Sequence, residues 1–185
     1  MFLSTQQLEA GVELIRQSPQ NNGLVEHIVC RPDIGTRQVL DEAVLDVSEG
    51  LVGDNWLMRG YRKTADGSSH PDMQLNLMNA RSIALIAQSK DRWQLAGDQF
   101  YVDLDLSYDN VPPGTRLALG EAIIEVTAEP HLGCQKFVER FGKDAALFVN
   151  SDTGKSLNLR GINAKVVKPG RVMVGDQISK SGGAL

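Results

Sequence analysis

The pattern that most constrains the fold of this chain is a series of short apolar segments that end at glycine, proline, asparagine or aspartate. The segments are rich in β-branched residues, which is typical of β-strands. They do not alternate regularly with helices, and this argues against a doubly wound parallel sheet. We predict strands at residues 24–31, 43–47, 73–78, 100–107, 116–119 and 122–127.

A glycine followed by a polar residue recurs where such segments end. Glycine adopts positive φ without strain, and an aspartate carboxylate accepts hydrogen bonds from nearby backbone amides. We therefore predict that these dipeptides are corners of a closed sheet, and we assign them to a β-barrel and not to an active site. They are Gly53-Asp54, Gly97-Asp98, Gly114-Thr115 and Gly175-Asp176.

A few short helices are expected beside the strands. Ser4 and Gln7 have the spacing of a capping box, which predicts a helix directly after them. Asn79 is a suitable N-cap for a second helix, and Gly142 a suitable end for a third one that follows a loop. The segments concerned are residues 4–17, 79–90 and 131–142.

The end of the sequence predicts a hairpin, with segments 159–168 and 171–174 joined by a turn at Pro169-Gly170. A length of 185 residues is that of one domain. We expect an N-terminal helical extension at 1–22, a β-barrel domain at 23–180 and a flexible tail at 181–185.

The charge balance limits the kinds of partner. Lys and Arg number 19 against 23 Asp and Glu, a net charge of −4, which argues against non-specific binding to nucleic acid or to an anionic membrane. An anionic ligand must then be held by a local basic cluster. The sequence has no run of about 20 apolar residues and no leader pattern, so we expect a cytoplasmic protein.

Two cysteines are too few for a disulfide scaffold or a zinc cluster. Cys30 ends a predicted strand, and we expect it in the core. Cys134 is expected in the first turn of a helix beside Lys136 and Arg140, where the thiolate is favoured. A thiolate can act as a nucleophile, carry sulfur as a persulfide or bind a soft metal. Its spacing with Phe137, Val138 and Phe141 equally fits a buried apolar stripe.

A second candidate region lies after Gly53-Asp54. Arg59, Arg62 and Lys63 form a basic loop that is able to hold a phosphate or another oxyanion, although solvated surface charge gives the same pattern. Arg160 opens a predicted strand, where it points either into a barrel mouth or out to water.

Several of these features together resemble the MOSC domain, a family named after the C-terminal domain of molybdenum cofactor sulfurase. The resemblance runs from about residue 24 to residue 178. It rests on Gly-Leu-Val-Gly-Asp at 50–54, Pro-Gly-Thr-Arg-Leu-Ala-Leu-Gly at 113–120, Glu-Ala-Ile-Ile-Glu-Val-Thr at 121–127, His-x-Gly-Cys-x-Lys-Phe at 131–137, Arg-Gly-Ile at 160–162 and Gly-Asp at 175–176.

The resemblance implies a mainly β fold, a MOSC or pyruvate-kinase-barrel-like β-barrel with a few short helices. It also implies one functional cysteine, at Cys134. In similar proteins this residue accepts sulfur as a persulfide for metal-sulfur assembly, or ligates the molybdenum of a molybdopterin cofactor in enzymes that reduce N-hydroxylated compounds. A cysteine desulfurase or an electron-donor protein is the expected partner, together with a small-molecule ligand.

The cofactor phosphate of similar proteins is held by basic side chains. The full-length sulfurase also uses pyridoxal phosphate, but the domain that binds it has no counterpart in these 185 residues, and we expect none here. The resemblance suggests these residues for cofactor binding: Arg59, Arg62, Lys63, His131, Lys136 and Arg160.

The sequence departs from the family pattern in two places. Many relatives have a proline directly before the cysteine and an arginine ahead of it, where this chain has Gly133 and His131. Many also have a Glu-Asn pair in the segment that here follows Gly97-Asp98. An alternative function is a non-catalytic barrel that binds a small anionic ligand or a partner protein, with Cys134 in its core.

Overall fold

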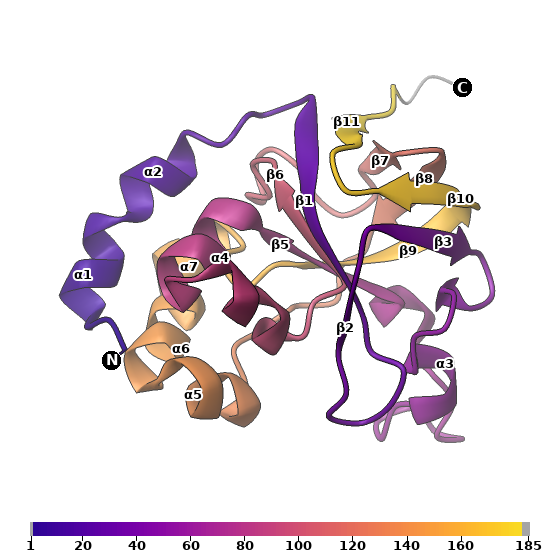
Figure 1. Ribbon diagram of the computed structural model, residues 1–185, viewed down its shortest axis with the longest axis horizontal. Helices are drawn as coiled ribbons and strands as arrows, with labels where there is room; N and C mark the ends of the chain where they lie inside the picture. Colours follow the sequence, from indigo (N-terminus) through magenta and orange to yellow (C-terminus); the bar gives the residue numbers. More distant parts are fainter. Residues whose placement is uncertain (1, 183–185) are drawn as a thin grey trace.

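The predicted strands close into a barrel, except for the strand at 43–47, which belongs to a smaller sheet. The computed structural model describes residues 2–182, and within them seven strands are hydrogen-bonded in the cyclic order β11-β7-β8-β9-β5-β6-β1, with β11 pairing back to β1 (Figure 1). A short strand, β2 (Gln38–Leu40), extends the sheet beyond β1. The barrel strands are β1 (Gly23–Cys30), β5 (Leu75–Asn79), β6 (Phe100–Asp103), β7 (Arg116–Leu119), β8 (Ala122–Val126), β9 (Ile162–Lys168) and β11 (Gln177–Lys180).

One pair of neighbouring barrel strands, β5 and β6, is parallel. Parallel neighbours need a crossover connection, and helix α4 (Ala80–Ala87) and the 3-10 helix η2 (Lys90–Ala96) provide it. Asn79 caps α4 as predicted, because its side chain accepts a hydrogen bond from the Ser82 amide. The second predicted helix therefore joins two strands of the barrel wall.

A smaller sheet covers the barrel, with the strand order β10-β3-β4. Its strands are β10 (Gly170–Met173), β3 (Glu42–Asp46) and β4 (Gly50–Leu51). The predicted closing hairpin is therefore wrong, since β10 pairs with β3 and not with β9. Strand β9 already has β5 on one edge and β8 on the other, which leaves no edge free for β10.

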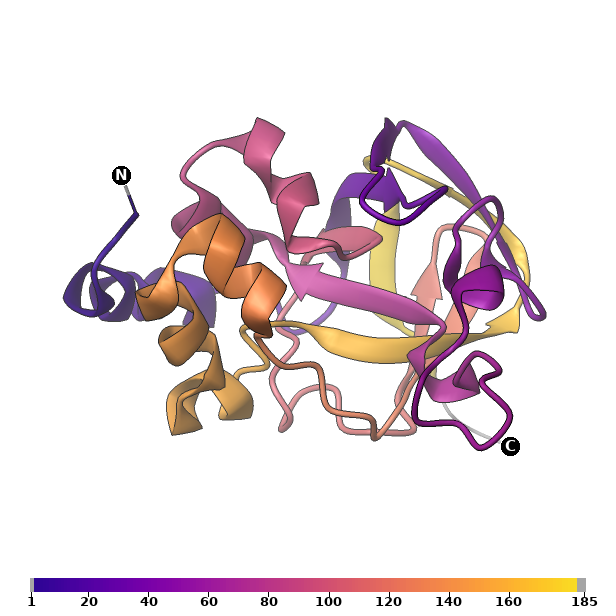
Figure 2. The same cartoon turned by 90° about the horizontal axis from the view of Figure 1, so that it is seen from below.

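Most helices gather on one side of the barrel (Figures 1 and 2). The predicted first helix begins with the Ser4 and Gln7 capping box but is interrupted at Gly11. The predicted third helix ends at Gly142 as expected. The remaining helices are α1 (Thr5–Ala10), α2 (Val12–Arg16), α3 (Trp56–Arg59), the 3-10 helix η1 (Pro71–Met73), α5 (Gln135–Phe141), α6 (Lys143–Asn150) and α7 (Asp152–Ser156).

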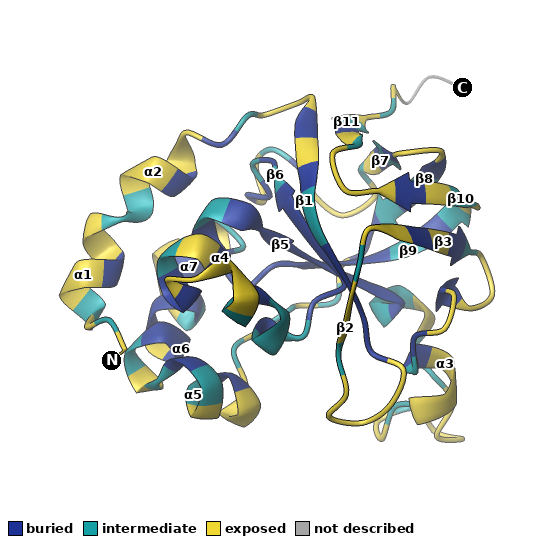
Figure 3. Ribbon diagram, viewed as in Figure 1, coloured by how far each residue is buried: buried dark blue, intermediate teal, exposed yellow. Residues whose placement is uncertain are grey.

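The apolar core has two parts, and their buried residues are among those coloured dark blue in Figure 3. One fills the barrel, with residues such as Leu45, Phe100 and Ile124. The other lies between the barrel wall and the helices, where Met78 and Tyr101 meet residues of α4, α5 and α6. The barrel wall is thus buried on both faces where helices cover it, which explains the unbroken burial of β5.

None of the helices in the described part of the chain has the length and apolar character needed to cross a membrane. The predicted tail, residues 181–185, lies largely outside the described residues, and the predicted domain limits at 22 and 180 stay predictions.

Gly161 provides a test of this packing. Its φ is +111°, and a Cβ atom there would lie 2.2 Å from the carbonyl oxygen of Leu77 on β5. Gly175 also has positive φ, at +92°, but no atom lies within 4 Å of its Cβ position. We expect Gly175→Ala to lower the free energy of unfolding by about 1–3 kcal/mol from backbone strain, and Gly161→Ala to lower it further through the clash. Chemical denaturation measures both, and equal losses would contradict the packing.

Candidate functional site

A buried arginine joins three loops at one end of the barrel. Arg31 follows β1, and its Nε and Nη2 donate to the two carboxylate oxygens of Asp54, each at 2.9 Å. Its Nη1 donates to Asn76 Oδ1 and to the carbonyl oxygen of Gly97. Asp54 also accepts from the amides of Arg31 and Trp56. The pair is fully hydrogen-bonded, which is the condition under which a buried ion pair is tolerated.

A second buried arginine lies close by. Arg160 Nη1 donates to Asp98 Oδ2 at 2.7 Å, and Nη2 donates to the Ala96 carbonyl oxygen. His131 Nδ1 lies 3.4 Å from the other carboxylate oxygen of Asp98, without the geometry of a hydrogen bond. Burial lowers the pKa of His131 well below its usual value, and the positive charges of Arg160 and Arg31 lower it further. The imidazole is therefore neutral at physiological pH.

These two ion pairs extend the prediction for the Gly-Asp corners. Gly53, Gly97, Gly114 and Gly175 all have positive φ, as expected for corners. However, the aspartates of the first two corners are buried and each binds an arginine from another segment. Neither pairing could be predicted from the sequence, because the partner arginines lie 23 and 62 residues away from the aspartates.

A layer of buried amide side chains lies next to the two arginines. The side-chain Nδ2 of Asn76 donates to Asn163 Oδ1 at 2.6 Å, and the backbone N–H of Asn76 donates to Gln99 Oε1. Asn163 Nδ2 donates to the carbonyl oxygen of Glu129, in the segment that leads to Cys134. Asn76 and Asn163 lie in segments predicted as strands, and Gln99 directly precedes one, but no role was predicted for their side chains. Polar residues inside otherwise apolar strands were the one signal that could have found them.

Cys134 is exposed and free. Cys134 was expected in the first turn of the helix, but it is the N-cap of α5, one position before that turn. Its side chain is not buried, unlike those of Phe137 and Phe141. The interpretation of Cys134 as a core residue is therefore wrong, because α5 turns the apolar stripe inward only from Phe137 onward. The other prediction is confirmed: Cys30 is buried, and burial raises the pKa of its thiol.

The backbone just before Cys134 is held by one side chain. Asn150, the last residue of α6, accepts from the Gly133 amide and donates to the Gly133 carbonyl oxygen, both at 2.9 Å. A Cβ atom at Gly133 would lie 2.9 Å from Val149 Cγ2. This double hydrogen bond accounts for the missing proline of the family pattern, since proline has no amide hydrogen to donate.

A pocket of about 260 Å³ lies beside α5 and has a strongly basic lining. We call it the basic pocket. Among its lining residues, Arg37, Arg59, Lys136 and Arg140 form no ion pair in the part of the chain that the structure describes. Its lining is Arg31, Asp33, Ile34, Gly35, Thr36, Arg37, Asn55, Arg59, Lys136, Glu139 and Arg140.

The cations of the basic pocket affect one another. Partial burial lowers the pKa of Arg37, and the neighbouring Arg140 and Arg31 lower it further. Burial and Arg31 likewise lower the pKa of Arg59, although its side chain remains accessible at the pocket. Arg37 Nε is also buried without a hydrogen-bond partner. Repulsion among cations together with an unused donor favours an anionic ligand at this place.

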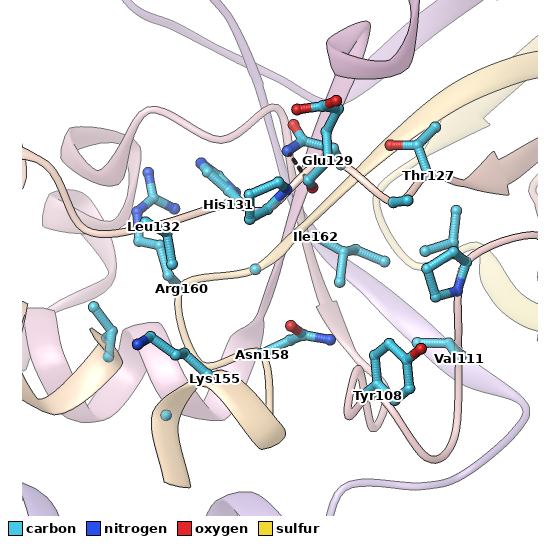
Figure 4. A pocket seen from close by; sticks show the side chains of 18 residues that line it. Tyr108, Val111, Thr127, Glu129, His131, Leu132, Lys155, Asn158, Arg160 and Ile162 are labelled. Atoms are coloured by element: carbon cyan, nitrogen blue, oxygen red, sulfur yellow. Dashed lines mark hydrogen bonds between the residues drawn. The ribbon is translucent and has the colours of Figure 1, made fainter. Parts of the chain in front are cut away.

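A second pocket, of about 350 Å³, is lined in part by residues 126–132, the segment that leads to Cys134 (Figure 4). We call it the apolar pocket, because valine, leucine, isoleucine and proline side chains make up much of its wall. Its lining is Tyr108, Val111, Pro113, Val126, Thr127, Ala128, Glu129, Pro130, His131, Leu132, Val149, Gly154, Lys155, Asn158, Arg160, Gly161, Ile162 and Asn163.

The structure divides the predicted site residues into three groups. Arg59 and Lys136 line the basic pocket, and His131 and Arg160 line the apolar pocket. Arg62 and Lys63 are exposed in the loop after α3 and line neither of these two pockets. Arg31 and Arg37 of the basic pocket were not predicted, because they lie far from the other residues in sequence. Within the described residues, no group of three or more His, Cys, Asp and Glu side chains could hold a metal ion.

A family model for the MOSC domain matches residues 64–179, which is more than half of the chain. This chain belongs to the MOSC family. The segment that matches includes both Cys134 and Arg160, so the predicted resemblance is confirmed. The family is linked to molybdenum cofactor proteins.

Solved structures of other MOSC proteins share the fold. The YuaD protein from Bacillus subtilis is 16% identical with a TM-score of 0.60, covering 86% of this chain and 97% of its own. YiiM from Escherichia coli is 21% identical with a TM-score of 0.55, covering 87% and 71%. YiiM from Geobacillus stearothermophilus is 14% identical with a TM-score of 0.54, covering 88% and 73%. No curated protein sequence matches the chain.

Asp54→Asn tests the role of the first ion pair. The substitution leaves Arg31 buried without a counter-charge, and we expect it to lower the free energy of unfolding by about 3–5 kcal/mol. Asp46→Asn is the control, because Asp46 lies on the surface and accepts hydrogen bonds only from Ser48 and Glu49. Its effect should be much smaller. Denaturant titration measures both, and a similar loss in the two variants would contradict the proposed role of Asp54.

His131 predicts a dependence of stability on pH. Its pKa is lowered in the folded state, so the unfolded state binds the proton first as the pH falls below about 6.5, and stability is lost. We expect His131→Gln to reduce this loss between pH 7 and 5 by up to about 1.4 kcal/mol per pH unit. Burial also lowers the pKa of His27, which keeps part of the slope in the variant. Equal slopes in variant and parent would exclude a buried neutral His131.

Proposed function

We propose that this chain binds molybdenum cofactor, with Cys134 as the protein ligand of molybdenum and the basic pocket as the site of the cofactor phosphate. The observation that carries the proposal is the position of an exposed free thiol directly before α5, the helix whose Lys136 and Arg140 line the basic pocket. Family membership agrees with this assignment.

The donor set fits such a group. A thiolate is a soft ligand of the kind that binds metal-sulfur centres. Cys134 supplies one such ligand, and a molybdopterin supplies sulfur ligands of its own. In the basic pocket, Arg37, Arg59 and Lys136 have no carboxylate partner in the described structure, and Arg37 Nε is an unused buried donor. Arginine is well suited to phosphate because its donors match the oxygen spacing.

The other residues would position and shield the cofactor. The double hydrogen bond from Asn150 fixes the backbone of Gly133, and this sets where the Cys134 side chain starts. The hydrogen bonds of Arg160 to Asp98 and Ala96 hold the end of η2 against the start of β9, and His131 of the cysteine loop lies 3.4 Å from Asp98. His131 is neutral and lies on the apolar pocket side, so it adds no charge near the metal. The cofactor, when bound, would supply two-electron redox chemistry at molybdenum.

Reduction of an N-hydroxylated compound is the reaction that the family resemblance favours for such a site. Such a reduction consumes two electrons, which would come from a separate donor protein. Sulfur transfer is the second candidate, and the same exposed thiol favours it. In that case Cys134 would accept a sulfur atom from a cysteine desulfurase as a persulfide.

The molybdenum content of purified protein tests the proposal. After expression in a host that makes the cofactor, we expect stoichiometric molybdenum and pterin in the parent protein and loss of molybdenum in Cys134→Ser. Arg59→Gln should weaken cofactor retention through the basic pocket. The matched control is Arg62→Gln, which removes the same charge three residues further along the chain, in the loop after α3 and outside this pocket.

Two results would contradict cofactor binding. One is sub-stoichiometric molybdenum in both the parent and Cys134→Ser. The other is equal retention in Arg59→Gln and Arg62→Gln, which would exclude the basic pocket as the phosphate site. If molybdenum is absent and mass spectrometry finds one added sulfur on Cys134 after incubation with a cysteine desulfurase, the sulfur-transfer function replaces the first proposal.

A further inference from the structure

The apolar pocket is separate from the basic pocket, and the two share no lining residue. Its volume of about 350 Å³ is near the lower end of the range for small-molecule sites in proteins. Buried Val111, Val126, Val149 and Ile162 form part of its wall, with Leu132 on the loop before Cys134. A compact apolar body fits such a wall, and a strongly hydrated ligand does not.

The polar groups of the apolar pocket indicate which charge the ligand carries. Lys155 on α7 forms no ion pair in the described part of the chain, and it lines the pocket from an exposed position (Figure 4). Arg160 is 6% exposed, lines the same pocket and has no hydrogen-bond partner for Nε. Its other two nitrogens are already bound to Asp98 and Ala96. The pocket therefore offers one uncompensated positive charge and one unused buried donor.

A single acidic residue lines the apolar pocket, namely Glu129, and its carboxylate is 3.7 Å from His70 Nε2. Lys155 and Glu129 lie at different parts of the pocket in Figure 4, on either side of Ile162. The His70 ring lies outside the pocket lining, and Lys155 is the cation of the lining that has no ion-pair partner within residues 2–182.

We propose that the apolar pocket binds a small organic monocarboxylate with a compact apolar body. The carboxylate would bind Lys155 and use the free Nε donor of Arg160, while the apolar body contacts the valine and isoleucine wall. A phosphate dianion would be poorly balanced by one free cation, and an ammonium group placed at the same position would be repelled by Lys155 and Arg160. The proposal does not depend on a metal at Cys134, because none of its contacts involves the thiol.

Hydrocinnamate is a suitable probe, since it joins one carboxylate to one compact ring. Isothermal titration of the full chain at neutral pH should show saturable binding of hydrocinnamate. Hydrocinnamamide has nearly the same shape without the charge, and phenylpropylamine carries the opposite charge. We expect the amide to bind about tenfold more weakly, as for loss of one charge-assisted hydrogen bond, and the amine not to bind.

Variants locate the binding site. Lys155→Gln should weaken hydrocinnamate binding by about tenfold and leave the amide unchanged, which a merely structural effect would not do. Lys143→Gln is the matched control, because Lys143 is an exposed lysine on neighbouring α6 and does not line the pocket. Leu132→Trp fills the pocket from a half-exposed position and should weaken binding of both the acid and the amide.

Three outcomes would overturn the proposal. They are absence of hydrocinnamate binding, equal affinity for acid, amide and amine, and equal effects of Lys155→Gln and Lys143→Gln. Binding by the parent that persists in Cys134→Ser supports a site independent of the thiol, whereas loss of binding in that variant contradicts it. Failure of molybdenum to bind would leave these titrations unchanged.

Discussion

The arrangement at the end of the barrel depends on two arginines that are buried and still charged. A buried cation is costly unless a counter-charge and hydrogen-bond acceptors surround it. Arg31 and Arg160 meet this condition with Asp54 and Asp98, and each also binds a backbone carbonyl oxygen at positions 96 and 97. Both arginines therefore fix the same short connection between η2 and β6.

The two arginines line environments of opposite character, since Arg31 lines the basic pocket and Arg160 lines the apolar pocket. On one side, cations without partners gather around Arg37 and Arg59. On the other side, the wall is built from aliphatic side chains, with few charges. The loop from His131 to Lys136 lies between the two and presents its thiol to solvent. A protein with a net charge of −4 can hold an anion at this end because its positive charge is concentrated there.

The sequence predicted the elements whose signal is local. The Ser4 capping box, the Asn79 cap, the end of α5 at Gly142 and most barrel strands could be inferred from neighbouring residues.

Pairings between segments far apart in the sequence could not be inferred in this way. β10 follows a turn that resembles a hairpin, but its partner is β3, more than 120 residues earlier. β11 has one buried apolar residue, Ile178, and exists because β1 and β7 pair with it from both sides. The helix pair α6 and α7 contains Asn150 and Gly154, which weaken a local helix signal, and packing stabilises it. In the site, exposure of Cys134 depended on where α5 meets the barrel, which spacing alone does not determine.

The double hydrogen bond between Gly133 and Asn150 makes the residue at each of these positions depend on the residue at the other. An asparagine at the end of α6 gains its two bonds only if residue 133 keeps an amide hydrogen, and a side chain at 133 would meet Val149. A homologue with proline before the cysteine loses one of these bonds and has no reason to retain the asparagine. Positions 133 and 150 should therefore change together among MOSC proteins, and the residue at the end of α6 should reveal which way a given relative holds its cysteine loop.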